Sequence, residues 1–323
     1  MAKTELLLAR LNALSPENDE FVPLLRQSLL GGNGVVAARA AELAKIYHCA
    51  DLAAELDSAF QRFMQDPAKT DKGCLAKVAI VEALRELAPA SYTVFMTGIH
   101  HVQMEPVYGG KADMAGPLRE ACAYALGAGA HPEAHYELSR LLLDPEPGPR
   151  LAAARALSGL PGRDSELVLQ MKVFMGDERA DVMGECFGAL LSMNPRFIPL
   201  VVNFLQSPDL ALVEEAALAL GQSRKETAFE LLHDAYEEAF SSHHKQILLL
   251  PMALTRTEES FAFLIDLVAN AHVTLAVAAV KALNLYAADA PRTRQIKEAA
   301  KAHTDHRVVE LMRAEFNSRG KAL

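Results

Sequence analysis

Residues 118–127 read LREACAYALG, and residues 216–221 read AALALG. Both stretches place small side chains at neighbouring positions of an apolar helix, which lets a second helix approach closely. An Ala-Leu pair of the same kind recurs at residues 83–84, 125–126, 156–157, 189–190, 219–220, 253–254 and 282–283. The spacings between successive leucines are 42, 31, 33, 30, 34 and 29 residues. Periods of this size are typical of stacked helical repeats.

A partner helix with larger apolar side chains is predicted upstream of most of these stretches, at residues 21–30, 52–64, 134–143, 167–175, 197–205, 229–240 and 261–268. Turn signals such as Gln65-Asp66-Pro67 and Ser207-Pro208-Asp209 separate the helices, since Asp or Ser can cap and Pro stops a helix. Each unit is therefore predicted to be a helical hairpin. A lone hairpin cannot cover its apolar face, so neighbouring units must stack.

This pattern resembles the HEAT family, and particularly its short bacterial form of about 30 residues per unit, in which the second helix reads roughly Val-Arg-x-x-Ala-Ala-x-Ala-Leu-Gly. The match covers about residues 19–316. The resemblance implies an all-α fold, an α-α superhelix of the armadillo/HEAT type with about eight to nine hairpins. A single array over residues 1–323 is expected, with a capping helix at 1–18, an inserted loop at 99–116 and a C-terminal cap at 291–323. The tetratricopeptide array has a similar period, but its Trp positions have no counterpart in a chain without tryptophan.

Charge and cysteine use narrow the classes of function. The formal net charge of -9 opposes binding to phosphate, because nonspecific affinity for nucleic acid comes mainly from Lys and Arg. Cys49, Cys74, Cys122 and Cys186 form no CxxC pair and are interpreted as small buried thiols. The amphipathic N-terminus does not read as a signal peptide, and no uncharged stretch reaches about 18 apolar residues. We therefore expect a cytoplasmic protein that does not enter a membrane.

Two sets of positions are candidates for binding on the repeat surface. In HEAT-like stacks the second helices usually line a concave face, and the residues two before each leucine are expected to be exposed there: Glu82, Tyr124, Arg155, Gly188, Leu218, Met252 and Lys281. This row is neither basic nor aromatic, so it favours a protein or peptide over nucleic acid. Seven residues before the leucine stand Lys77, Arg119 and Arg150. They match either a structural basic residue of the family or a local anion site.

The longest spacing, between Leu84 and Leu126, contains an insertion with chemistry unusual for this chain. Pro106 and Gly109-Gly110 forbid a simple helix and predict a loop of about a dozen residues. Its candidate residues are His100, His101, Glu105, Tyr108, Lys111 and Asp113. Three alternatives stand: a packing loop whose His and Glu are satisfied by local backbone groups, a loop that binds a partner or small ligand, and a metal or catalytic site. The last is disfavoured because adjacent helical residues point about 100° apart.

The leading functional prediction is a noncatalytic scaffold that binds a protein or peptide partner through the concave face and the 100–113 loop. It assigns no catalytic residue, no metal and no cofactor. The alternative, by resemblance, is a HEAT-type bilin lyase or another protein that binds a small ligand, and an absorbance change on adding a bilin would support it. A DNA-repair protein of the alkylpurine glycosylase type is disfavoured by the acidic balance and the absence of Trp.

Overall fold

A computed structural model describes residues 2–129 and 131–317 of the chain. Contacts divide it into two units, residues 1–168 and 169–323, and each is described by itself. Helix α11 (Asp164–Met175) crosses the boundary between them. Within the described residues, no helix has both the length and the apolar character needed to cross a bilayer.

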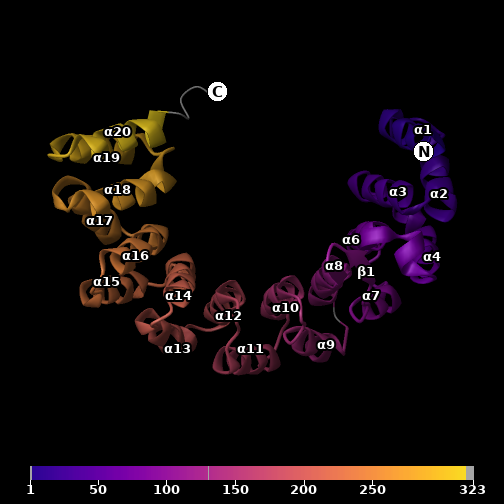
Figure 1. The fold of residues 1–323 in the computed structure, drawn as a ribbon, viewed down its shortest axis with the longest axis horizontal. Helices are drawn as coiled ribbons and strands as arrows, with labels where there is room; N and C mark the ends of the chain where they lie inside the picture. The colour runs from indigo at the N-terminus through magenta and orange to yellow at the C-terminus, as the bar shows by residue number, and fades with distance from the viewer. Residues whose placement is uncertain (1, 130, 318–323) are drawn as a thin grey trace. The chain divides into compact units, whose positions relative to one another are not determined.

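The first unit consists of helical hairpins with one short strand pair (Figure 1). Its elements are α1 (Ala2–Ala13), α2 (Phe21–Gly31), α3 (Gly34–Ile46), η1 (Ala50–Leu52), α4 (Ala53–Met64), α5 (Pro67–Thr70), η2 (Lys72–Cys74), α6 (Leu75–Leu87), α7 (Tyr92–Gly98), β1 (Met104–Val107), β2 (Gly110–Asp113), α8 (Gly116–Ala128), α9 (Ala134–Leu141) and α10 (Pro147–Gly159). The predicted cap at 1–18 contains α1, and Met1 lies outside the described residues.

The second unit repeats the hairpin pattern without a strand among its described residues. Its elements are α12 (Ala180–Met193), η3 (Pro195–Phe197), α13 (Ile198–Val202), η4 (Asn203–Gln206), α14 (Leu210–Ser223), α15 (Ala228–Glu238), α16 (Ser242–Thr255), α17 (Glu258–Asn270), α18 (Val273–Ala282), η5 (Leu283–Tyr286), α19 (Ala290–Ala302) and α20 (His306–Asn317). The helix predicted at 197–205 is divided among η3, α13 and η4, and Pro199 has no backbone donor to continue η3 into α13. The predicted C-terminal cap contains α19 and α20, and residues 318–323 lie outside the described part.

The second helix of each hairpin packs on the second helices of its neighbours, in the order α3, α6, α8, α10 in the first unit and α12, α14, α16, α18, α20 in the second. The leucines of six Ala-Leu pairs are completely buried in these contacts: Leu84, Leu126, Leu157, Leu190, Leu220 and Leu283. Burial of such side chains stabilises each one by about 1.5–3 kcal/mol. The predicted all-α class of stacked helical hairpins is therefore confirmed.

One repeat was assigned to the wrong register. Met252 was expected on the exposed row, but it is fully buried, while Leu254 is partly exposed. Met252 thus fills the position that leucine holds in the other units, and the two flanking spacings become 32 and 31 residues instead of 34 and 29. The corrected exposed residue of α16 is Leu250, which is 45% exposed.

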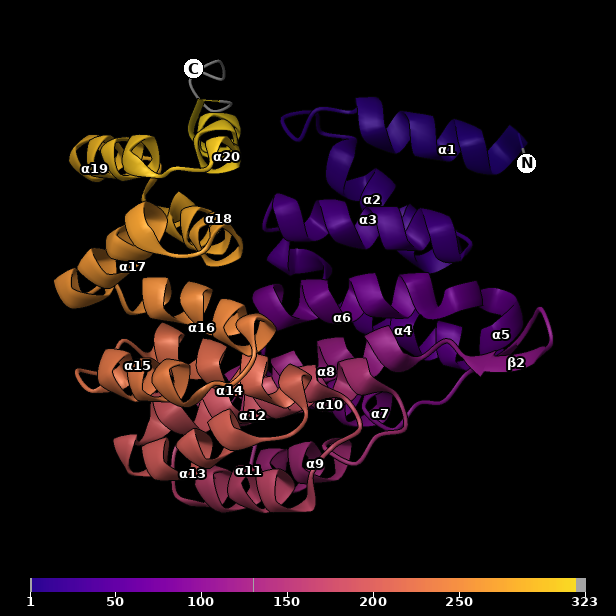
Figure 2. The ribbon, with the colours of Figure 1, turned by 60° about the vertical axis from the view of Figure 1, so that its left-hand side comes forward.

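The insertion was predicted as a loop, but it contains a short β-hairpin, whose strand β2 is labelled in Figure 2. β1 and β2 pair antiparallel from Met104 with Asp113 to Val107 with Gly110. Gly109 closes the turn at φ 87°, a conformation that favours glycine. The strand signal was missed because the buried side chain of β1 is the polar Glu105, whereas its neighbours face solvent. Sequence patterns normally reveal a strand by an apolar inward face.

The four cysteines are free thiols, and Cys74, Cys122 and Cys186 are buried as predicted. Cys49 is only partly buried. Burial raises the pKa of Cys74 and of Cys186 to about 12. These two thiols are therefore protonated near neutral pH, in keeping with a packing role.

Candidate functional site

Polar side chains at the base of the hairpin fix it to the start of α6. Gln103 and Glu105 are 2% and 3% exposed. Oε1 of Glu105 accepts hydrogen bonds from the N–H of Gly73 at 2.7 Å and from Nε2 of Gln103 at 2.6 Å. The same Nε2 donates to the carbonyl of Asp71 at 2.9 Å. The insertion is thus tied to a turn about 30 residues earlier in the chain, through groups that would be costly to bury unpaired.

Asp71 and Lys77 form a completely buried ion pair beside this contact. The Nζ of Lys77 lies 3.0 Å from Oδ2 of Asp71, and neither side chain is exposed. The carboxylate of Asp71 also accepts from the backbone N–H groups of Ala76 and Lys77 at 2.8 and 3.0 Å. It therefore satisfies donors at the start of α6, where a negative charge is favoured.

Arg119 of α8 joins the hairpin to the following repeat. Its Nη1 donates to Oδ2 of Asp113 at 2.7 Å and to the carbonyl of His101 at 2.9 Å. Its Nε and Nη2 bind the two carboxylate oxygens of Asp144 at 2.7 and 2.9 Å. This fork-to-fork geometry is the strongest arrangement for a guanidinium and a carboxylate. Burial acts to lower the pKa of Arg119, but the bonds to Asp144 and Asp113 outweigh it and raise that pKa.

Arg150 of α10 is likewise buried, at 4% exposed. Its Nη1 donates to the carbonyls of Asp144 and Pro145 at 2.8 and 3.1 Å. With Lys77 and Arg119 it forms the basic ladder predicted from the sequence, and all three side chains are engaged inside the stack. Of the two alternatives that the sequence left open for these residues, burial favours the structural role over a surface anion site. Each of the three residues lies near a helix start or a turn, where carboxylates and backbone carbonyls are available as partners.

A groove of about 690 Å³ lies between the hairpin and α9 with the segment that follows it. Its lining brings together four of the predicted residues, His100, Lys111, Asp113 and Arg119. Nε2 of His100 lies 3.0 Å from the carboxylate oxygen Oε2 of Glu137, whose side chain is 8% exposed. Tyr124 and Arg155 are not among the groove residues; the former is half-buried on α8 and the latter is exposed on α10.

Apolar side chains stand exposed along the hairpin and the groove. Tyr108, at the turn, is fully exposed, and Val102, Met104, Val107 and Leu143 are 59%, 49%, 46% and 62% exposed. Val102, Met104 and Leu143 also line the groove. An exposed set of this kind, above a rigid polar anchor, is typical of a contact surface for another macromolecule.

Sequence reasoning missed Gln103, Glu137 and Leu143, which complete the site. Gln103 carried a detectable signal, since it stands two residues before Glu105 and so shares its strand face. Glu137 and Leu143 come from the next repeat, and only stacking places them there. Of the three alternatives for the insertion, packing applies to its base, where Glu105 and His101 contact Gly73 and Gln103. Among the described residues, no group of three or more His, Cys, Asp or Glu side chains is placed to hold a metal ion.

The carboxylates at the base of the hairpin predict a loss of stability in acid. Burial acts to raise the pKa of Glu105 and of Asp113. Hydrogen bonds from Gly73 and Gln103 to the first, and from Gln103, Ala115 and Arg119 to the second, leave each pKa below its ordinary value. A carboxyl group whose pKa is lower in the folded than in the unfolded chain stabilises the fold. This stabilisation is complete above the unfolded pKa of about 4 and is lost as the pH falls through the folded pKa. The melting temperature should therefore hold from pH 7 to about pH 5 and fall below about pH 4.

Thermal unfolding followed by circular dichroism between pH 3 and pH 7 measures this effect. Glu105→Gln should lower the melting temperature at pH 7 and flatten its dependence on pH. Asp305→Asn is the matched control, because Arg307 lowers the pKa of Asp305 at a partly exposed position in the second unit, where salt screens the pair. If the melting temperature lost its pH dependence equally in both variants, Glu105 would have no special role in the acid response.

Comparison with known proteins gives a coarse result. No family model and no curated protein matches the chain. Among solved structures, a chain from the complex of CpcE and CpcF of phycocyanin lyase from Nostoc sp. PCC7120 is similar, with 19% identity, 94% of this chain and 98% of that chain covered, and a TM-score of 0.37. A similarity at this level transfers no residue role or activity. The contacts between helices show stacked helical hairpins within each unit.

Proposed function

We propose that the chain is a noncatalytic scaffold that binds a protein partner through the β-hairpin and the groove beside it. The observation that carries this proposal is the combination of a rigid base with an exposed apolar tip. Tyr108 is fully exposed at the turn, while Glu105, three residues away, is buried in hydrogen bonds. Because the base is held by hydrogen bonds, binding at the tip requires little ordering of the backbone.

The chemistry of the tip favours a protein surface as the partner. Tyrosine supplies a large apolar area together with a hydroxyl, and it is enriched among the residues that dominate protein interfaces. Val107 flanks Tyr108, and Lys111 adds a cation on the opposite strand. The net charge of -9 disfavours nucleic acid as the ligand. The concave face of the repeats stays a predicted second contact.

Photo-crosslinking in the native host tests the proposal. A benzophenone amino acid placed at Tyr108 should give one or a few discrete cross-linked products, because the partner contacts this tip. The same group at Phe240 is the matched control, since Phe240 is an equally exposed aromatic residue in the second unit. Identical products from both positions, or none from Tyr108, would refute the placement of the site.

A second arm separates the tip from the groove. With the benzophenone at Met104, which lines the groove, the additional change Tyr108→Ala should reduce cross-linking by about tenfold, the effect of losing a contact worth about 1.4 kcal/mol. An undiminished yield would show that Tyr108 contributes nothing to binding. The circular dichroism melt of each variant should match the parent chain, since both side chains are exposed.

A further inference from the structure

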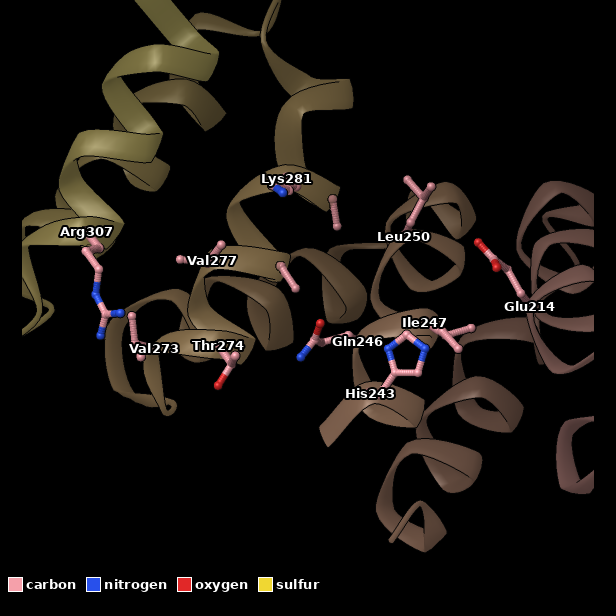
Figure 3. A pocket seen from close by; sticks show the side chains of 12 residues that line it. Glu214, His243, Gln246, Ile247, Leu250, Val273, Thr274, Val277, Lys281 and Arg307 are labelled. Carbon is pink, nitrogen blue, oxygen red and sulfur yellow. The ribbon is translucent and has the colours of Figure 1, made fainter. Parts of the chain in front are cut away.

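A second groove, of about 640 Å³, lies entirely within the second unit and is separate from the hairpin site (Figure 3). It crosses the row of second helices from α14 through α16 and α18 to α20. The corrected register of α16 accounts for the side chains in this groove. Leu250 stands two residues before the buried Met252, and Lys281 stands two residues before the buried Leu283, so both are exposed.

The floor of this groove is apolar. It is lined by Ile247 and Leu250 of α16 and by Val273, Val277 and Ala278 of α18. Leu250 is 45% exposed, and the other four are partly exposed. Covering apolar surface yields about 25 cal/mol for each Å² removed from water. The floor thus favours a ligand with an apolar face.

The two sides of the groove carry opposite charge. Glu214 of α14 stands at one side, and Lys281 of α18 and Arg307 of α20 stand toward the other (Figure 3). Among the side chains that the structure describes, neither Glu214 nor Lys281 forms an ion pair, whereas Arg307 binds Asp305 at 2.7 Å. The charges of Glu214 and Lys281 therefore remain available to a ligand.

Neighbouring carboxylates strengthen the acidic side. Burial raises the pKa of Glu215, and the negative charges of Asp181, Glu214 and Glu185 raise it further. The shift has the sign expected of a negative potential around α12 and α14. A cationic group of a ligand is therefore attracted to this side, and an anionic group to the side of Lys281.

The walls and floor of the groove consist of helices. This favours a helical over an extended conformation for a bound peptide. Backbone groups inside α14, α16 and α18 are already paired within their own helices. An extended peptide would find few backbone partners on such a surface, whereas a helix satisfies its own backbone groups. From α14 to α20 there are three helix-to-helix steps, each about 8–10 Å, a span that a helix of about 18 residues covers.

We propose that the groove in the second unit binds an amphipathic α-helix of a partner protein, with its apolar face on Ile247, Leu250 and Val277, its basic side chains at Glu214 and its acidic side chains at Lys281. This inference goes beyond the proposed function, because it concerns another surface and a defined ligand chemistry. Helix recognition in an apolar groove reads the ligand through side chains spaced three and four residues apart.

Fluorescence anisotropy of labelled synthetic peptides with the full chain tests this proposal. Three peptides of about 18 residues share one leucine stripe and differ in their polar positions. The first carries Glu in one half and Lys in the other, the second carries Glu throughout, and the third carries Lys throughout. The mixed peptide should bind at least tenfold more tightly than either uniform peptide. Equal affinities, or no binding by any peptide, would overturn the proposal.

Variants of the chain locate the binding. Leu250→Asp should weaken binding of the mixed peptide at least tenfold, and Lys281→Glu should shift the preference at least tenfold toward the Lys peptide, because both sides of the groove then become acidic. Tyr108→Ala should change nothing, so this test and the cross-linking test can fail independently. Attraction of the Lys peptide to the acidic chain as a whole is measured by the affinity that survives in Leu250→Asp. Unchanged binding in that variant would place the peptides elsewhere.

Discussion

Replacing Arg119 with alanine should lower the free energy of unfolding by about 3–5 kcal/mol, the cost of leaving buried charges without their partner. The guanidinium is 4% exposed and holds two carboxylates, Asp113 at 13% and Asp144 at 8% exposed. Removing it leaves both in a poorly hydrated environment and also frees the carbonyl of His101. Equilibrium urea unfolding, followed by circular dichroism, measures the change.

Two control variants make this result specific. Arg119→Lys keeps the charge but loses the bidentate contact with Asp144. It should therefore lower the free energy of unfolding by less than the alanine variant does. Arg140→Ala removes an arginine that is 56% exposed on the neighbouring helix, and it should change stability by less than about 0.5 kcal/mol. Hydrogen exchange of residues 102–114 should accelerate selectively in Arg119→Ala. If Arg119→Ala lowered the free energy of unfolding by less than about 1 kcal/mol, water would be replacing the guanidinium as the partner of the two carboxylates.

Two glycine-to-alanine changes in the second unit should have opposite signs. A Cβ added at Gly221 of α14 would lie 2.2 Å from the carbonyl oxygen and 2.9 Å from the carbonyl carbon of Pro251 in α16. These backbone atoms cannot move aside without separating the two helices, so Gly221→Ala should cost about 1–3 kcal/mol. A Cβ added at Gly188 of α12 meets no atom within 4 Å. Gly188→Ala should therefore stabilise the chain by about 0.5–1 kcal/mol.

The comparison uses thermal and urea unfolding of the two variants and the parent chain. Both substitutions lie within helices and change the same atoms, so propensity favours alanine equally at both positions. The difference between them reports only how closely α14 approaches α16. Stabilisation by both substitutions would show that this helix pair is looser than the structure has it.

The repeat architecture could be predicted from particular residues. Alanine and glycine at 216–221 and leucine at Leu84, Leu126 and Leu157 are spaced for helices that pack through small side chains, and these positions are buried. The register failed where Ala253-Leu254 imitates the motif two residues beyond its structural place, which Met252 occupies. Methionine fills a leucine position because it is flexible and of similar volume, so composition alone could not distinguish them.

The sequence indicated where the candidate site lies along the chain, but not its secondary structure. Residues 100–113 were identified from a broken period, yet the hairpin was missed because Gln103 and Glu105 face inward. The roles of Lys77, Arg119 and Arg150 were open in the sequence, where a structural basic residue and a surface basic residue look the same. Burial beside Asp71 and Asp144 decided between them.

The sequence by itself determined that the chain folds into stacked helical hairpins and that the period is interrupted before Leu126, since helix periodicity and small-residue spacing are local properties. Only the tertiary structure decided which charges are buried, how the insertion pairs, and where the two grooves lie. Arg119 meets a carboxylate 25 residues away in Asp144, and Leu250 shares a groove with Lys281 of the next repeat. Such contacts depend on how one hairpin stacks on the next, and the spacing of residues along the chain leaves that geometry undetermined.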